Sequence, residues 1–162
     1  MHPSPPDSAA SLLLPVVRPA TLADQEILVR LEQRCFEQDR FSRQSLRYLL
    51  THAHASTLLC TVDGRAAGYV TLLFRRCTPI ARIYSIARDP NFRGCRIGDA
   101  LLDAAEQCAL EHGCGVLRLE VRTDNAASIA MFRRRGYQQF GEFAAYYEDR
   151  QDALGFQKCL AA

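Results

Sequence analysis

The sequence predicts an α/β domain built on a mixed, mostly antiparallel sheet with helices on both faces. Three observations lead to this fold class. Apolar residues change between helical and strand-like spacing several times along the chain. Asp63-Gly64 joins two β-rich runs as a hairpin turn would. A strand, a helix and a strand follow one another between residues 81 and 122, which implies a right-handed parallel crossover.

The first half of the chain is predicted to hold one strand, two helices and an antiparallel meander. Pro19 ends the first strand, and Thr21 with Asp24 three residues later has the pattern of a helix cap. Ser42 has the pattern of a second cap. The expected elements are a strand at residues 16–19, a helix with Leu28, Leu31 and Cys35 on one face, a helix with Leu46, Leu49 and Leu50 on one face, a polar loop at 51–56, and strands at 57–62, 66–74 and 81–87.

The second half is predicted to supply the crossover and the end of the sheet. A helix is expected over residues 98–112, where apolar residues recur at helical spacing until Gly113 and Gly115. The remaining elements are a strand at 116–122, a helix capped by Asp124 or Asn125 and closed by Gly136, and strands near 137–143 and 153–160. We expect residues 15–162 to form one domain after a Pro- and Ser-rich, disordered tail at residues 1–14.

Charge and cysteine content argue against several classes of protein. The net charge of +2 predicts no strong attraction to nucleic acid or to a membrane, and no apolar run approaches the roughly 18 residues of a membrane span. The apolar run at residues 12–14 is too short for a signal peptide. The seven cysteines include no CxxC pair and no Cys/His ligand spacing, so we expect neither disulfides nor a metal site. Free thiols in a reducing cytoplasm are expected instead.

The segment with most chemistry is the turn Arg93-Gly94-Cys95-Arg96-Ile97-Gly98-Asp99, between a strand and a long helix. A helix N-terminus exposes unpaired N–H groups, and small residues allow a phosphate to approach them. Arg93 and Arg96 can add charge-assisted contacts. The turn therefore suits a pyrophosphate, although neither a Rossmann GxGxxG nor a P-loop is present. The alternative is a plain glycine turn with solvated arginines.

This turn resembles the acyl-CoA-binding signature of the GNAT superfamily of N-acetyltransferases, Gln/Arg-x-x-Gly-x-Gly/Ala. Arg93 and Gly98 match its ends, whereas Arg96 stands where glycine is usual. Further motifs are similar to those of bacterial ribosomal-protein-alanine N-acetyltransferases. They are Leu-Glu-Gln-Arg-Cys-Phe from residue 31, Phe-Ser at 41, Ile-Ala-Arg-Asp-Pro from 86, Leu-Glu-Val-Arg from 119, Asn-Ala-Ala at 125, Tyr-Tyr at 146 and Asp-Ala at 152.

The resemblance implies that acetyl-CoA is the cosubstrate, lying between two splayed parallel strands at residues 81–87 and 116–122. Main-chain groups at the end of the strand at residues 81–87 would bind the pantetheine arm, and the turn at residues 93–99 would cradle the pyrophosphate. The cofactor-binding residues implied in this way are Ile86, Ala87, Arg88, Arg93, Gly94, Cys95, Arg96, Ile97, Gly98, Asp99, Asn125 and Phe132.

The resemblance also implies that Glu120 is the general base, because the family carries a glutamate on this strand. Strand alternation puts Glu120 on the same face as Arg118 and Arg122, so a structural ion pair with either arginine is the alternative. The tyrosine that serves the family as acid falls at Phe132, which cannot donate a proton. Tyr147 is the candidate acid, with Tyr137, Tyr146 and bulk water as alternatives.

The expected function is transfer of an acetyl group to an amine, most simply the N-terminal α-amine of a ribosomal or other protein. The acceptor would enter between the loop around Phe41 and the Tyr146-Tyr147 hairpin. Two alternatives stay open, because a fold does not determine a substrate. One is a small-molecule amine acetyltransferase, and the other is a CoA-binding sensor without turnover.

Overall fold

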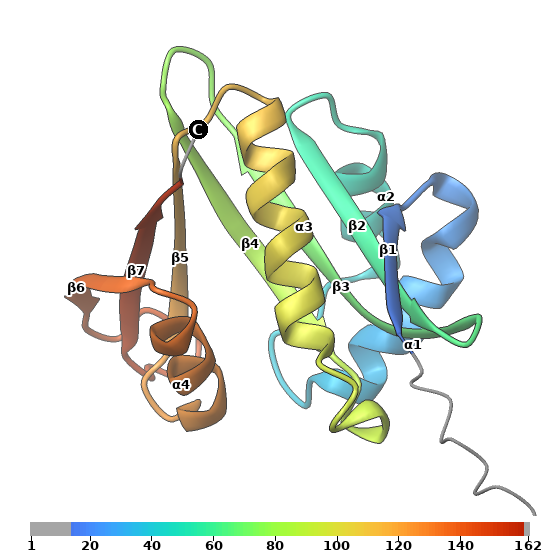
Figure 1. Ribbon diagram of the computed structural model, residues 1–162. Coiled ribbons are helices and arrows are strands. Elements are labelled where there is room, and N and C mark those ends of the chain that lie inside the picture. Colours follow the sequence, from blue (N-terminus) through green and yellow to red (C-terminus); the bar gives the residue numbers. More distant parts are fainter. Residues whose placement is uncertain (1–13, 161–162) are drawn as a thin grey trace, which may run out of the picture.

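The computed structural model describes residues 14–160 (Figure 1). In chain order the elements are β1 (Pro15–Pro19), α1 (Gln25–Cys35), α2 (Arg43–Thr51), β2 (Ala55–Val62), β3 (Arg65–Phe74), β4 (Ile80–Arg88), α3 (Ile97–Glu111), β5 (Val116–Arg122), α4 (Ala126–Arg134), β6 (Gln138–Phe143) and β7 (Ala153–Cys159), with short 3-10 helices at Leu22–Asp24 and Pro90–Phe92. Apart from Leu14, the tail predicted at residues 1–14 lies outside the described residues. No helix between residues 14 and 160 is long and apolar enough to cross a membrane.

The strands form one seven-stranded sheet in the order β1-β2-β3-β4-β5-β7-β6. Every neighbouring pair is antiparallel except β4 and β5, which α3 connects. α3 packs on one face of the sheet, whereas α1 and α2 pack on the other (Figure 1). An apolar core fills each of the two interfaces. The predicted fold class, a mixed sheet with helices on both faces, is confirmed.

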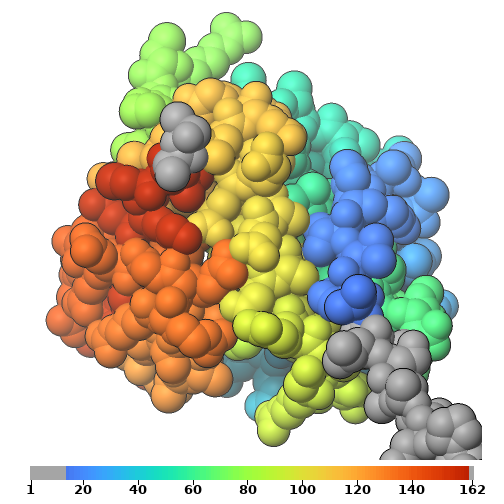
Figure 2. Space-filling view, in the orientation of Figure 1, coloured from blue at the N-terminus to red at the C-terminus, as the bar shows by residue number. Residues whose placement is uncertain are grey.

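α3 runs down the middle of one face of the molecule, between the N-terminal elements and the C-terminal ones (Figure 2). Arg135, directly after α4, connects the two helices through ion pairs with Asp99 at 3.7 Å, Glu106 at 2.9 Å and Asp103. The beginning of α3 is therefore held beside α4. This arrangement places the turn at residues 93–99 next to the helix that follows β5.

The local signals read from the sequence are present at the predicted residues. Thr21 and Asp24 form the capping box, and Ser42 Oγ accepts the Ser45 N–H at 3.1 Å. Of the two candidate caps of α4, Asn125 is the one that accepts the Ser128 N–H, at 3.2 Å. The loop predicted at residues 51–56 is too long, because Ala55 and Ser56 already pair with β3 as part of β2. A partner strand extends an element beyond what its own hydrophobic pattern indicates.

The two parallel strands separate halfway along their length. They pair only from Ile80 opposite Val116 to Ile83 opposite Leu119, although β4 continues to Arg88 and β5 to Arg122. Tyr84 is an extra residue in β4 relative to β3, so the strand bends at this point. The predicted splay of the two central strands is therefore confirmed, and it leaves backbone groups free at the place where an extended ligand would need them.

Candidate active site

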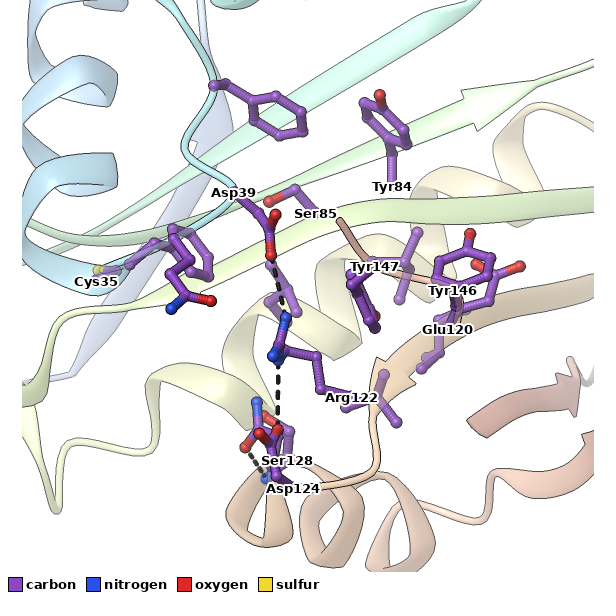
Figure 3. A pocket seen from close by; sticks show the side chains of 18 of the residues that line it. Cys35, Asp39, Tyr84, Ser85, Glu120, Arg122, Asp124, Ser128, Tyr146 and Tyr147 are labelled. Carbon is purple, nitrogen blue, oxygen red and sulfur yellow. Dashed lines mark hydrogen bonds and ion pairs between the residues drawn. The ribbon is translucent and has the colours of Figure 1, made fainter. Parts of the chain in front are cut away.

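A cleft of about 630 Å³ opens where β4 and β5 diverge (Figure 3). Its walls come from the segment between α1 and α2, from β4, from β5 with the start of α4, and from the connection between β6 and β7. Five of the predicted site residues line it: Ile86, Glu120, Asn125, Phe132 and Tyr147. The others, Ala87, Arg88 and the turn at 93–99, do not line the cleft. Phe41 and Tyr146, on opposite sides of the expected acceptor entrance, do line it.

Glu120 lies on the wall formed by β5, and its side chain is 18% exposed. Its Oε2 accepts a hydrogen bond from Arg82 Nε at 2.9 Å, and Arg82 Nη2 donates to the Tyr146 hydroxyl at 2.8 Å. The alternative interpretation of Glu120, a structural ion pair with Arg118 or Arg122, is not what the structure shows, because its partner is Arg82. Arg118 donates to Gln157 instead, and β4 supplies the true partner because it runs parallel to β5 at this level.

Arg122 joins the segments on the two sides of the cleft. Its guanidinium pairs with Asp39 between α1 and α2 at 3.1 Å and with Asp124 after β5 at 3.3 Å (Figure 3). It also pairs with Asp149 between β6 and β7. The same guanidinium lies 4.8 Å from the centre of the Tyr147 ring. These contacts hold both flanking segments over the cleft, at the end of β5.

The Tyr147 hydroxyl stays protonated, as the role of proton donor requires. Burial is the main cause that raises the pKa of its hydroxyl to about 12, so the phenol is neutral at physiological pH. The Tyr146 hydroxyl is engaged by Arg82. Tyr137 is buried beside Phe132 at a ring separation of 5.7 Å and does not line the cleft, which removes it as a proton donor.

Charged side chains around the cleft are mostly acidic. Two arginines, Arg82 and Arg122, face five carboxylates from Glu37, Asp39, Glu120, Asp124 and Asp149. A cleft with an excess of one sign of charge attracts ligands of the opposite sign. The cleft therefore favours a cationic acceptor such as an alkylammonium.

The turn before α3 exposes main-chain N–H groups at the start of the helix and contains two residues in the left-handed region. α3 begins at Ile97, so the N–H groups of its first turn have no partner within the helix. Gly94 has φ of 83° and Arg96 has φ of 58°, both in the left-handed region. Arg96 thus adopts the conformation that glycine tolerates best, at the position where the family signature has glycine.

Arg88 and Gly98 connect this turn to the cleft. Arg88 donates to Ser128 Oγ at 3.1 Å, and Ser128 lines the cleft. Burial, followed by the nearby Arg134, lowers the pKa of the Arg88 guanidinium, and no carboxylate of residues 14–160 lies within ion-pair distance of it. A side chain at Gly98 would overlap Met131 Sδ and lie 3.1 Å from Arg88 Cδ. Gly98 therefore serves the close packing of α3 against Met131 and Arg88.

Several contributors to the cleft were not predicted from sequence. Arg82 is the partner of Glu120, and Tyr84 stacks on Phe41 with ring centres 5.2 Å apart. Because Ile83 is buried, strand alternation places Arg82 on the opposite face of β4. That this is the face of the sheet that carries Glu120, and that the two residues are close enough to pair, follows only from the register of β4 against β5. Ser128 carries no signal beyond its place in the first turn of α4.

Comparison with known proteins supports the expectation from the sequence. Residues 25–137, more than half of the chain, match the Acetyltransferase (GNAT) family. The chain is 32% identical to the N-alpha-acetyltransferase RimI of Mycobacterium tuberculosis over 130 residues, which cover 78% of this chain and 80% of that protein. It is 38% identical to the L-2,4-diaminobutyric acid acetyltransferase of Nocardia farcinica over 88 residues, covering 51% of this chain and 46% of that protein.

The fold agrees as well. The crystal structure of the ribosomal-protein-S18-alanine N-acetyltransferase from Escherichia coli superimposes with a TM-score of 0.81 at 23% identity, over 92% of this chain and 96% of that chain. The chain spans about half the length of some curated relatives, such as 48% of an uncharacterized N-acetyltransferase of Methanocaldococcus jannaschii.

Fold, cleft and sequence match together define an N-acetyltransferase that uses acetyl-CoA. The chain belongs to the GNAT family, and bacterial ribosomal-protein-alanine N-acetyltransferases are among its relatives. The predicted family and the predicted class of enzyme are both confirmed.

Proposed function

We propose that the chain acetylates the N-terminal α-amine of a protein, with a ribosomal protein among the candidate acceptors and the cytoplasm as the place of action. The observation that carries the proposal is the cleft itself, with Glu120 on its wall and an excess of carboxylates around it. An α-ammonium is cationic before it is deprotonated, and this charge matches the cleft. The acceptors named for the Mycobacterium tuberculosis and Escherichia coli relatives are of the same kind.

Acetyl-CoA is proposed to lie in the splay between β4 and β5 with its pyrophosphate at the start of α3. The free N–H groups of the first turn of α3 and the Arg88 guanidinium, which has no carboxylate partner among residues 14–160, form a cationic corner beside Ser128. Ile86, Ala87 and Arg88 pair with β3 on one side of β4 but not with β5 on the other, so main-chain groups that point toward β5 there are free to bind the pantetheine arm. Asn125 and Phe132 border the same space from α4.

Direct transfer forms one C–N bond and breaks the C–S bond of the thioester. The attacking amine must lose a proton, and the leaving thiolate gains one. Glu120, which Arg82 holds in place, is proposed to position the amine or take its proton. Tyr147 is proposed as the proton donor to the thiolate, because its hydroxyl stays protonated at neutral pH.

An acceptor screen tests this function. The rate of CoA release would be compared for two peptides and two small amines. One hexapeptide has a free N-terminal alanine, and the other has a blocked N-terminus and an internal lysine. The small amines are spermidine and 2,4-diaminobutyrate. We expect the free α-amine to give the highest kcat/KM. Glu120→Gln should lower that value by about 10²-fold, near the lower end for a general base, while Glu142→Gln on the exposed β6 serves as the matched control.

The second candidate function is acetylation of a small diamine or amino acid. The Nocardia farcinica relative, named for 2,4-diaminobutyric acid, and the acidic cleft both favour it. A higher kcat/KM for 2,4-diaminobutyrate than for the free-amine peptide would establish this function and overturn the first. If no amine led to CoA release, both acetyltransferase functions would be overturned, and the chain would be a CoA-binding sensor without turnover.

A further inference from the structure

A line of hydrogen-bonded side chains leads from the floor of the cleft into the core beneath α1. Ser85 on β4 lines the cleft (Figure 3), and its Oγ lies 3.3 Å from the hydroxyl oxygen of Tyr69 on β3. The Tyr69 hydroxyl donates in turn to Oε1 of Glu32 on α1. Tyr69 and Glu32 are 0% and 1% exposed, so water does not reach them directly.

The direction of these hydrogen bonds is determined by Glu32. An ionised carboxylate only accepts, so Tyr69 gives its proton to Glu32 and can only accept from Ser85. Ser85 then donates to Tyr69 and turns the lone pairs of its oxygen toward the cleft. An N–H group in the cleft would thus find a hydrogen-bond acceptor that is connected to a buried carboxylate.

A purely structural role for Glu32 would not require an ionisable side chain. The other oxygen of Glu32 accepts the Phe41 N–H at 2.9 Å and so anchors the segment between α1 and α2. The single amide oxygen of a glutamine, with two lone pairs, has the capacity to accept from both Phe41 and Tyr69 without burying a charge. No lysine or arginine in the described part of the chain forms an ion pair with Glu32.

We propose that Ser85, Tyr69 and Glu32 form a relay that takes the proton from the acceptor amine. As the amine nitrogen bonds to the thioester carbon, it passes a proton to Ser85 Oγ. Ser85 passes its own proton to Tyr69, and Tyr69 passes its proton to Glu32 Oε1. Both hydroxyls are neutral again, Glu32 is a neutral acid, and the thiolate departs with the electron pair of the C–S bond. The proton returns to solvent between turnovers.

The surroundings of Glu32 suit a proton acceptor. Burial raises the pKa of its carboxyl, so the carboxylate has a higher proton affinity than an exposed glutamate. The hydrogen bonds from Tyr69 and from the Phe41 amide, and then the charge of Arg40, act against this rise in the pKa of Glu32. Cys35 on α1 is a neutral thiol, because burial raises its pKa to about 11. Farther along α1, Arg34 is paired with Asp89 at 2.8 Å. Of these groups, Glu32 is the carboxylate whose proton affinity burial raises.

The relay gives Glu120 a distinct task. Glu120 is already paired with Arg82 and faces the open cleft, where it can hold the neutral amine in position for attack once the ammonium group has lost its first proton to water. This inference rests on the proposed placement of the acceptor in the cleft, but not on which amine the enzyme uses. Its test can therefore use whichever acceptor the screen identifies.

Ser85→Ala and Tyr69→Phe break the relay at two points without touching the bond between Glu32 and the Phe41 amide. We expect each to lower kcat by about 10²-fold, with unchanged KM for acetyl-CoA. Ser85→Ala combined with Tyr69→Phe should be no slower than either alone, because a relay interrupted once no longer works. Glu32→Gln should show the same loss and should also abolish the decline of kcat at low pH.

Thr57→Val is the matched control, because it removes a buried hydroxyl that bonds Thr71 at 2.9 Å on the same sheet without contact to the cleft. Its kcat should equal that of the wild type, and thermal melting would show that all variants are folded at the assay temperature. Losses that multiply in the double variant, or a kcat within twofold of wild type for Ser85→Ala at every pH from 6 to 9, would overturn the relay. If Glu120→Gln also left kcat unchanged, the acceptor would not bind in the cleft, and the proposed function would be overturned together with the relay.

Discussion

Replacing Arg88 by methionine should weaken acetyl-CoA binding without weakening the fold. Arg88 is a half-buried cation whose bonds go to Ser128 Oγ at 3.1 Å and Met131 Sδ at 3.4 Å, with no carboxylate of residues 14–160 in ion-pair range. Burial disfavours its charge, which an incoming pyrophosphate would balance. Methionine keeps the length that packs against Gly98 and removes the charge.

The magnitude follows from the type of contact that is lost. A hydrogen bond to a charged group contributes about 1.5–3 kcal/mol, and 1.4 kcal/mol corresponds to a factor of ten. Titration calorimetry should therefore show a Kd for acetyl-CoA raised about ten- to hundredfold, while the Tm without ligand stays equal or rises. Arg76→Met, in the exposed connection between β3 and β4, makes the same charge change and should leave Kd unaltered. Acetyl-pantetheine, which lacks the pyrophosphate, should bind both variants equally. A Kd for Arg88→Met within twofold of wild type would refute the cationic corner.

Two further predictions concern the turn that precedes α3. Gly98→Ala should destabilise the protein by about 1–3 kcal/mol, because the added methyl would overlap Met131 Sδ; an unchanged midpoint in urea would contradict the packing of α3 on α4. Arg96→Gly should raise stability by up to about 1 kcal/mol, because glycine avoids the roughly 1–2 kcal/mol cost of a left-handed residue and loses part of this gain through its greater chain entropy. A lower Tm for Arg96→Gly would mean that the Arg96 side chain stabilises the turn more than its backbone strains it.

The sequence by itself determined the elements, because their signals are local. The Thr21–Asp24 capping box, the Ser42 cap and the Asp63-Gly64 hairpin act within a few residues along the chain, and the structure has each of them. Alternation also determined that Glu120 turns away from the core, since period-two spacing does not depend on the partner strand. The family resemblance rested on motifs of the same short range, and it is confirmed.

Only the tertiary structure decided which side chains meet. Glu120 could pair with Arg118 or Arg122 by sequence proximity, but the parallel alignment of β4 with β5 brings Arg82 to it instead. The packing role of Gly98 appears only when α4 lies against α3 and supplies Met131. The burial of Glu32 depends on β3 and on the segment before α2 closing over it. Contacts between elements distant in sequence depend on register and packing, and these are set by the whole core rather than by any one segment.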